Sequence, residues 1–377
     1  MKILIIGAGL GGLTMAHALK TYLPQAEFKI IEKSTSLRAT GASIALPGNA
    51  VDAFKYLSMQ EQILKTAHPI SKIRYLKYNG KLLSETKLAE HPILKDYQFI
   101  ALQREELIHL LAQDILPHIQ FNTVIKQYTQ QDKLTHIELS DDSHFTADLI
   151  IDASGVNSTH RQAICGQDLR EDLGISCWRF LTSRKTADPS YYLLSPNGGL
   201  GLLYPTSGNQ SYVYLQRVQE KDNYSTDVDK ASLVRFFAKF APELQEAIDS
   251  TPTEKIIASR LVSVSEPIMT DHKSTVFIGD AAAACSPQLQ QGYASAIEDA
   301  LTLAWSLQAK PQLEDALLCY EQLRLSRVQW IKNASDTPSK SSQALIIYFQ
   351  EELLPRKSER TAPSMCKAGR LYWKKIT

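Results

Sequence analysis

Several patterns that define whole classes of protein are missing from this chain of 377 residues. It has no run of about 18 apolar residues, so we expect no membrane-spanning helix. The formal net charge is +1 and no basic stripe alternates with aromatic residues, so nothing indicates a nucleic-acid partner. No small-residue cleavage site follows the apolar N-terminal stretch, which favours a cytoplasmic protein over a secreted one.

Sequence patterns typical of metal ligands and of catalytic nucleophiles are also missing. The 5 cysteines include no C-x-x-C pair, which fits a reducing compartment and free thiols. The 9 histidines show neither H-x-x-x-H nor H-E-x-x-H spacing, so we expect no metal site. No G-x-S-x-G motif is present, and nothing indicates a serine nucleophile.

A glycine-rich turn between two apolar runs is the most informative pattern in the chain. The first run covers residues 2–6, the second covers 28–31 and is followed by Glu32, and the turn contains Gly7, Gly9, Leu10, Gly11 and Gly12. This order predicts strand, turn, helix and strand, with the free N–H groups of a helix that opens at 13–15 facing a pyrophosphate. Glu32 is expected to accept hydrogen bonds from a ribose, which favours FAD or NAD over NADP.

Two later apolar strands end in small or acidic residues, the position at which open α/β sheets bind ligands. The first, 147–152, leads into Ser154 and Gly155. The second, 274–278, leads into Gly279 and Asp280. An aspartate there can cap the next helix, but its place beside a nucleotide fold favours a cofactor hydroxyl as its partner.

Segments with a different periodicity interrupt the α/β pattern. Residues 71–88 alternate around an Asn-Gly turn, and residues 175–218 alternate and are rich in aromatics. Both predict antiparallel strands, which could line a substrate pocket. Beyond about residue 330 the chain is polar and helical in pattern, and its end is basic.

Taken in order, three motifs resemble those of the FAD-dependent aromatic-ring hydroxylases, flavoprotein monooxygenases related to p-hydroxybenzoate hydroxylase. They are the glycine-rich turn with Glu32, the segment 147–161, and Gly279-Asp280 with its downstream proline and glycine. The resemblance covers about residues 1–330. It implies an α/β fold: a Rossmann-like FAD-binding domain with an inserted antiparallel β-sheet substrate domain and C-terminal helices.

The resemblance also implies domain limits. The FAD-binding domain would comprise 1–70, 99–172 and 271–330, and the substrate domain 71–98 and 173–270. A C-terminal helical segment would cover 331–377.

The activity implied by the resemblance is hydroxylation of a small aromatic or polycyclic compound. NADPH or NADH would reduce the FAD, and O2 would then form a flavin C4a-hydroperoxide. The protein would be a monomer or a homodimer. Catalytic roles fall to Arg179 and Pro287. The expected cofactor-binding residues are Gly7, Gly9, Leu10, Gly11, Gly12, Glu32, Lys33, Arg38, Gly41, Arg104, Ser154, Gly155, Gly279, Asp280, Gln291 and Gly292.

The chain departs from the family at three positions. Ser154 stands where the family has an aspartate, Ala283 where it has a histidine, and Gln290 where it has a glycine. Without the aspartate we expect Arg161 to be less restrained and reduction by free NAD(P)H to be weak.

Other functions stay open at this point. One is a flavin oxidase, dehydrogenase or reductase on the same fold, and another is a flavin-binding protein without turnover. An NAD-dependent dehydrogenase would leave Gly279-Asp280 unexplained.

Overall fold

The computed structural model describes residues 1–37, 42–92, 94–193, 195–218 and 227–339. Arg38, Gly41 and the basic end of the chain, for which roles or charges were predicted, lie outside the described residues.

A five-stranded parallel sheet forms the centre of one half of the molecule. Its order is β18-β12-β1-β2-β8, and its strands are β1 (Lys2–Ile6), β2 (Glu27–Ile31), β8 (Ile119–Gln120), β12 (Leu149–Asp152) and β18 (Thr275–Phe277). Layers on both sides bury β1: Ile3 and Ile5 belong to the helical core, and Leu4 packs on the opposite side with side chains of residues 137–147. Burial on both faces explains why β1 is a continuous apolar run.

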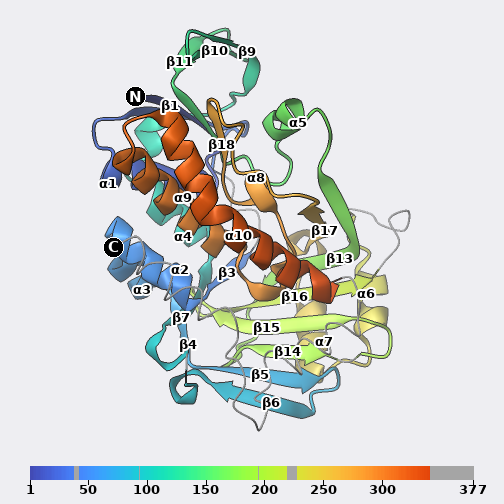
Figure 1. Ribbon diagram of the computed structural model, residues 1–377. Helices are drawn as coiled ribbons and strands as arrows, with labels where there is room; N and C mark the ends of the chain where they lie inside the picture. The colour runs from blue at the N-terminus through green and yellow to red at the C-terminus, as the bar shows by residue number, and fades with distance from the viewer. Residues whose placement is uncertain (38–41, 93, 194, 219–226, 340–377) are drawn as a thin grey trace.

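Helices cover one face of this sheet (Figure 1). The three that form most of the layer are α1 (Leu10–Tyr22), α9 (Gly292–Ala309) and α10 (Leu313–Ser339), with α9 packed against α1 and α10. Helix α4 (Arg104–Ala112) packs on α1. Shorter elements around them are α2 (Gly48–Ala53), η1 (Phe54–Leu57), α3 (Gln60–Thr66), η4 (Leu116–His118), α5 (Thr159–Cys165), α8 (Asp280–Ala283) and η7 (Pro287–Leu289).

The helix after the glycine-rich turn begins earlier than predicted. It starts at Leu10, not at residue 13, because the Leu13 N–H already donates to the Gly9 carbonyl at 3.0 Å. The N–H groups without a partner inside the helix are therefore those of Leu10, Gly11 and Gly12.

A seven-stranded sheet forms the second half of the molecule. Its order is β17-β13-β16-β15-β14-β5-β6, and its strands are β5 (Lys72–Lys77), β6 (Leu82–Lys87), β13 (Arg170–Thr182), β14 (Ser190–Leu193), β15 (Leu200–Thr206), β16 (Gln210–Val218) and β17 (Ile257–Val264). Helices α6 (Lys230–Phe237) and α7 (Pro242–Ser250) cover one face. The sheet is not wholly antiparallel as predicted, because β14 pairs with β5 in parallel.

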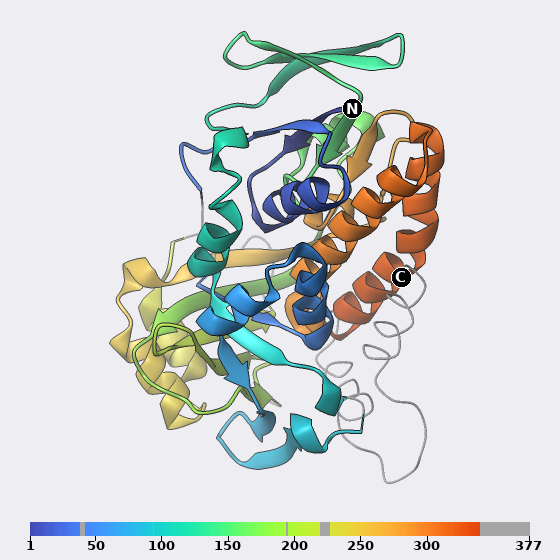
Figure 2. The same ribbon diagram turned by 90° about the vertical axis from the view of Figure 1, so that its left-hand side faces the viewer.

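The other face of the seven-stranded sheet points toward a small three-stranded sheet, β3-β7-β4. Its strands are β3 (Ser43–Leu46), β4 (His68–Ile70) and β7 (Phe99–Gln103). Aromatic side chains of the large sheet pack there against Ala45 and Ala101. A further sheet, β9 (Ile125–Gln131), β10 (Leu134–Leu139) and β11 (His144–Ala147), protrudes beyond the parallel sheet (Figure 2). The remaining short turns are η2 (Leu88–Glu90), η3 (Leu94–Asp96) and η6 (Thr253–Lys255).

Helix α10 links the two halves. It packs against α9, and it also contacts α8 and β13. Near its end Asp336 accepts hydrogen bonds from Ser263 Oγ of β17 at 2.6 Å and from the Ser286 N–H at 2.8 Å. The predicted domain division stays a prediction, although its limit at 331 falls inside α10. No helix in the described part of the chain is long and apolar enough to cross a membrane.

Candidate cofactor and substrate site

The glycine-rich turn leaves open space beside α1. Gly7 has φ +99°, and a Cβ there would lie 2.8 Å from the Ala153 carbonyl oxygen. A Cβ on Gly12 would lie 1.9 Å from the Gly7 carbonyl oxygen. The fold itself therefore requires glycine at both positions. At Gly9 a Cβ would meet no atom within 4 Å, so this residue faces unfilled space.

The N-terminus of α1 borders that space. No side chain caps this helix end and its first turn contains no acidic residue. The free N–H groups and the helix dipole favour a negative group here. A pyrophosphate fits this combination of open space and unpaired donors.

Glu32 lies beside the turn and holds it in place. Its Oε2 accepts from the Ala8 N–H at 2.9 Å, and its Oε1 accepts from the Ser34 N–H at 2.8 Å. Each carboxylate oxygen retains a second lone pair, so a ribose hydroxyl could still bond to it. Lys33, next in the chain, is exposed.

Three charged side chains from different elements meet near the start of α8. They are Asp280 of α8, Arg104 of α4 and Arg179 of β13. Burial lowers the pKa of Arg104, Asp280 opposes that shift, and Arg179 adds to it. Burial raises the pKa of Asp280, and Arg104 and Arg161 oppose the shift. Asp280 is nevertheless exposed, so its carboxylate is not packed in the core.

Hydrogen-bond donors in this cluster lack partners. Arg104 Nε and Arg179 Nε are both buried without one. Among the described residues, neither the guanidinium of Arg104 nor the carboxylate of Asp280 makes a hydrogen bond, and Arg179 makes one, from Nη2 to Ser259 Oγ at 2.9 Å. Buried donors are normally satisfied, so this cluster fits a polar ligand that completes it.

Ser154 does not face the cofactor space with a free hydroxyl. Its backbone N–H and its Oγ both donate to Asp152 Oδ1, at 2.9 and 2.6 Å. Ser158 Oγ donates to the other oxygen of this fully buried carboxylate. Gly155, at φ +84°, has open space where its Cβ would lie.

Arg161 is tightly held, so the prediction that it is loosely restrained is wrong. Its Nη1 donates to the Ala281 carbonyl at 2.8 Å and its Nη2 to the Val156 carbonyl at 2.7 Å. The side chain is 2% exposed. Backbone carbonyls supply the acceptors that we had expected from an aspartate at position 154.

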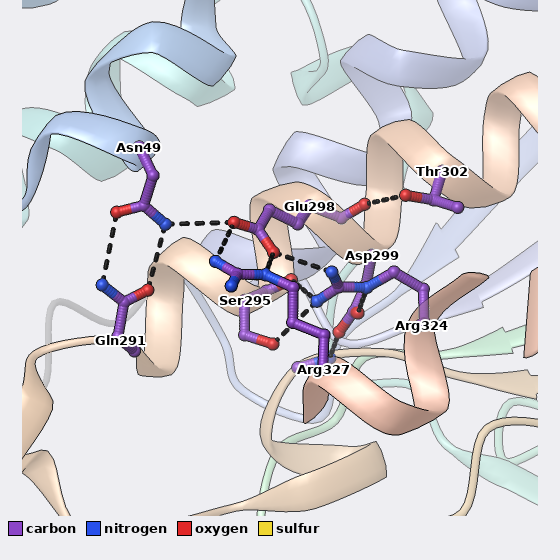
Figure 3. A network of polar contacts seen from close by, with 9 residues as sticks. Asn49, Gln291, Ser295, Glu298, Asp299, Thr302, Arg324 and Arg327 are labelled. Atoms are coloured by element: carbon purple, nitrogen blue, oxygen red, sulfur yellow. Dashed lines mark hydrogen bonds and ion pairs between the residues drawn. The ribbon is translucent and has the colours of Figure 1, made fainter. Parts of the chain in front are cut away.

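The loop 287–292 runs from α8 to α9. Pro287 is exposed. Gly292 opens α9, and a Cβ there would lie 3.8 Å from Asp280 Oδ1, which places the loop end beside the charged cluster. The side chain of Gln291 points elsewhere. It pairs amide to amide with Asn49, at 3.0 and 3.2 Å, so only its backbone can serve a cofactor (Figure 3).

A buried ionic network behind this loop was not foreseen from the sequence. Glu298 accepts from Arg324 Nη1 and Arg327 Nη2, both at 2.7 Å, and from Asn49 Nδ2 at 3.0 Å (Figure 3). Asp299 accepts from Arg324 Nε at 2.7 Å and from the Gly279 N–H at 2.9 Å. Burial alone would raise the pKa of Glu298, but the two arginines lower it to about 2. Two adjacent acids in an otherwise uncharged helix were the available signal.

A concavity that is partly open to solvent lies between the seven-stranded sheet and the loop 287–290. The segments predicted to line a pocket contribute to it: Tyr75 from β5, and Tyr191, Leu202 and Tyr204 from β14 and β15. The Tyr204 ring is tilted against the Tyr212 ring, with ring centroids 4.8 Å apart. Tyr212 in turn lies near Arg104 and Arg179, whose charges oppose the effect of burial on its pKa. The concavity therefore adjoins the charged cluster. Within the described residues no group of His, Cys, Asp and Glu could hold a metal ion.

A family model with the description "FAD binding domain" matches residues 1–335. Three curated proteins are similar over most of their length. Aurachin C monooxygenase/isomerase of Stigmatella aurantiaca is 23% identical, covering 87% of this chain and 86% of its own. The 2-heptyl-3-hydroxy-4(1H)-quinolone synthase of Pseudomonas aeruginosa (strain UCBPP-PA14) is 26% identical, covering 89% and 88%. The FAD-dependent urate hydroxylase of Klebsiella pneumoniae is 26% identical, covering 97% and 98%.

Solved structures share the fold. Klebsiella pneumoniae HpxO complexed with FAD and uric acid superposes with a TM-score of 0.84 at 23% identity, covering 93% of this chain and 92% of that one. Pseudomonas aeruginosa PqsL in complex with 2-aminobenzoylacetate gives a TM-score of 0.79 at 21% identity, covering 93% and 99%.

Proposed function

This chain belongs to the FAD-binding-domain family, and from that membership we propose where its cofactor and its substrate lie. It is an FAD-dependent oxidoreductase, a monooxygenase that hydroxylates an aromatic or heteroaromatic ring. One observation carries the placement: Arg104 and Arg179 keep buried donors without partners beside the unbonded carboxylate of Asp280. A second function has no comparable observation in its favour.

The adenosine diphosphate half of FAD lies along the glycine-rich turn. Its phosphates face the N–H groups that open α1, in the space beside Gly9. Glu32 accepts from the ribose while it keeps its bonds to the turn. Roles for Lys33, Arg38 and Gly41 rest on the sequence alone.

The flavin half lies against the charged cluster and the loop 287–292. Asp280 accepts hydrogen bonds from the ribityl hydroxyls, and Arg104 lies along the cofactor with its unpaired Nε directed to a polar group. When bound, FAD supplies the redox chemistry, taking electrons from NADPH or NADH and activating O2. The protein has to hold, orient and enclose it.

Arg179 approaches the same space from the substrate side. A cation fixed on a strand stabilises negative charge that develops on the flavin or the substrate, and it costs no reorganisation at that moment. The concavity lined by Tyr191 and Tyr204 receives the ring to be hydroxylated, and the bound ring displaces water from its apolar side chains.

That NAD(P)H reduces the flavin only weakly stays a prediction, but one of the two reasons for it no longer applies. Arg161 is held by carbonyls whatever residue occupies position 154. Ala283, in place of the family's histidine, remains as the reason for expecting it.

The direct test is to purify the protein and follow two signals. The visible spectrum should show oxidised flavin, and heteroaromatic compounds should stimulate aerobic NAD(P)H oxidation with a product that has gained one oxygen atom. Peroxide formation without such a product, across a broad panel, would instead indicate an oxidase.

A valine at Gly9 tests the placement of the pyrophosphate. Because a Cβ at Gly9 meets no protein atom within 4 Å, Gly9→Val should fold as the natural chain does. The new side chain would occupy the space assigned to the phosphates, so the protein should purify colourless, with FAD content lowered at least about 10-fold. Thermal unfolding of the apoprotein is the control. A folded variant with a full complement of FAD would disprove the placement.

A further inference from the structure

The wall of the concavity beside the 287–290 loop is uncharged. Tyrosines, aliphatic side chains and the amides of Gln288 and Gln290 line it, and the described lining residues include no Asp, Glu, Lys, Arg or His. Burial raises the pKa of Tyr191 to about 12, so its phenol stays neutral at physiological pH. An ionised group that binds against such a wall loses its hydration and finds no opposite charge in the lining.

Gln290 connects the two walls of this space. It has φ +53°, a left-handed backbone conformation that side chains other than glycine and asparagine seldom adopt. From there its Nε2 donates to Tyr191 Oη at 2.6 Å, across from the loop to β14. One N–H and the Oε1 of the amide then remain for another partner.

Gln288 adds a second amide to the lining of the concavity. Its Nε2 donates to Gln216 Oε1 at 3.0 Å, and the Tyr214 hydroxyl donates to that same oxygen at 2.7 Å. These bonds to β16 fix the direction of Gln288. The polar part of the lining is therefore made of oriented amides, which can both donate and accept.

We propose that Gln290 determines the substrate class of this site, a neutral aromatic heterocycle whose ring N–H or carbonyl bonds the Gln290 amide. The carboxylated analogue is rejected because no lining residue compensates its charge. The lining of the concavity, aromatic and aliphatic side chains with two oriented amides, has the composition typical of small-molecule sites. This assignment rests on the proposed function only in taking the concavity as the substrate site.

The test compares three ligands of one shape on the FAD-loaded protein by isothermal titration calorimetry. They are 4(1H)-quinolone, its 2-carboxylate and its 2-carboxamide, the last as a neutral control for the size of the substituent. The quinolone and the carboxamide should bind at least about 10-fold more tightly than the carboxylate. Equal or tighter binding of the carboxylate would overturn the proposal and assign the selectivity to Arg104 and Arg179.

Two variants then test Gln290 itself. Gln290→Gly suits the left-handed backbone and removes the amide, and Gln290→Leu removes the amide while keeping the bulk. Both should weaken quinolone binding by about 5- to 10-fold and leave binding of naphthalene, which has no polar edge, unchanged. Unchanged quinolone binding, or an equal loss of affinity for quinolone and naphthalene, would show that Gln290 does not bond the polar groups of the ring. Gln127→Leu on the exposed strand β9 is the matched control.

Calorimetry requires no turnover, so it separates two failures. A protein that shows these preferences but does not hydroxylate anything contradicts the proposed function alone. A protein that hydroxylates a carboxylated ring as its preferred substrate contradicts the neutral class alone.

Discussion

Two clusters of charge in this protein, one fully buried and one partly buried, differ in how completely they are paired. In the network between α9 and α10, both carboxylates accept several hydrogen bonds, and Arg324 bonds to Glu298, Asp299 and Ser295. In the cluster at the start of α8, the carboxylate of Asp280 makes no hydrogen bond with the described residues, and Arg104 Nε is buried without a partner. One donor of the first network, Arg327 Nη1, is also unpaired, but that guanidinium is otherwise bonded to Glu298.

The difference separates charge that holds the fold from charge that awaits a ligand. A fully hydrogen-bonded network gains nothing from a further polar group. Removing one of its side chains leaves the opposite charges buried without a partner. A cluster with unpaired donors is already destabilised in this way in the ligand-free protein, and a ligand that bonds to those donors removes the destabilisation. The two should therefore respond to mutation in opposite ways.

Removal of Arg324 should have the largest effect on stability. Arg324→Leu leaves Glu298 and Asp299 buried with too little positive charge, and the free energy of unfolding should fall by about 3–5 kcal/mol. Chemical denaturation of the apoprotein measures it. Arg170→Leu, which breaks the exposed pair with Asp168, is the matched control and should cost no more than about 1 kcal/mol. Equal losses in the two variants would refute the distinction.

Acid should weaken the same network. The pKa of Glu298 is about 2 in the folded protein, below its ordinary value of 4.5, so ionised Glu298 favours the folded state above pH 4.5. That stabilisation, about 3 kcal/mol, disappears as the pH falls from 4.5 toward 2. Across this range the free energy of unfolding should depend less on pH in Glu298→Gln than in the natural chain. An identical slope would remove Glu298 as the titrating group.

Arg104 should show the opposite behaviour. Arg104→Leu removes a cation whose buried Nε has no partner, so the apoprotein should be as stable as the natural one or more so. The Kd for FAD should rise about 10- to 100-fold, because a charged hydrogen bond to the ligand contributes about 1.5–3 kcal/mol. Fluorescence titration of the apoprotein with FAD measures the change. A loss of stability as large as that of Arg324→Leu would place Arg104 in the fold.

Arg179 should affect rates and leave binding intact. Arg179→Ala should slow flavin reduction or the oxygen reaction by about 10-fold in stopped-flow experiments, with FAD content unchanged. Arg217→Ala on the opposite face of the same sheet, where Arg217 lies over the Trp178 ring at 5.3 Å, is the control and should leave both rates unchanged. Unchanged rates in Arg179→Ala would make Arg179 a structural residue bonded to Ser259.

The turn, the fold class and the cofactor were accessible from the sequence. Gly7 and Gly12 are required by local backbone conformation and by contacts within the first βαβ unit, and such requirements follow from spacing along the chain. Apolar periodicity likewise located β1, β2, β12 and β18 and the alternating strands of the large sheet. The family and its cofactor followed from three such local patterns in order.

The pairing of polar side chains was decided by the tertiary structure. Asn49 meets Gln291, and Glu298 meets Arg324, only because α2, α9 and α10 pack together. Arg161 is satisfied by carbonyls that α8 and the loop before α5 bring to it, so the residue at 154 was a poor guide to its freedom. Local sequence spacing determines backbone conformation, which is a short-range property. A buried charge or amide must find a partner wherever the packed elements place one, and that choice exists only once the chain has folded.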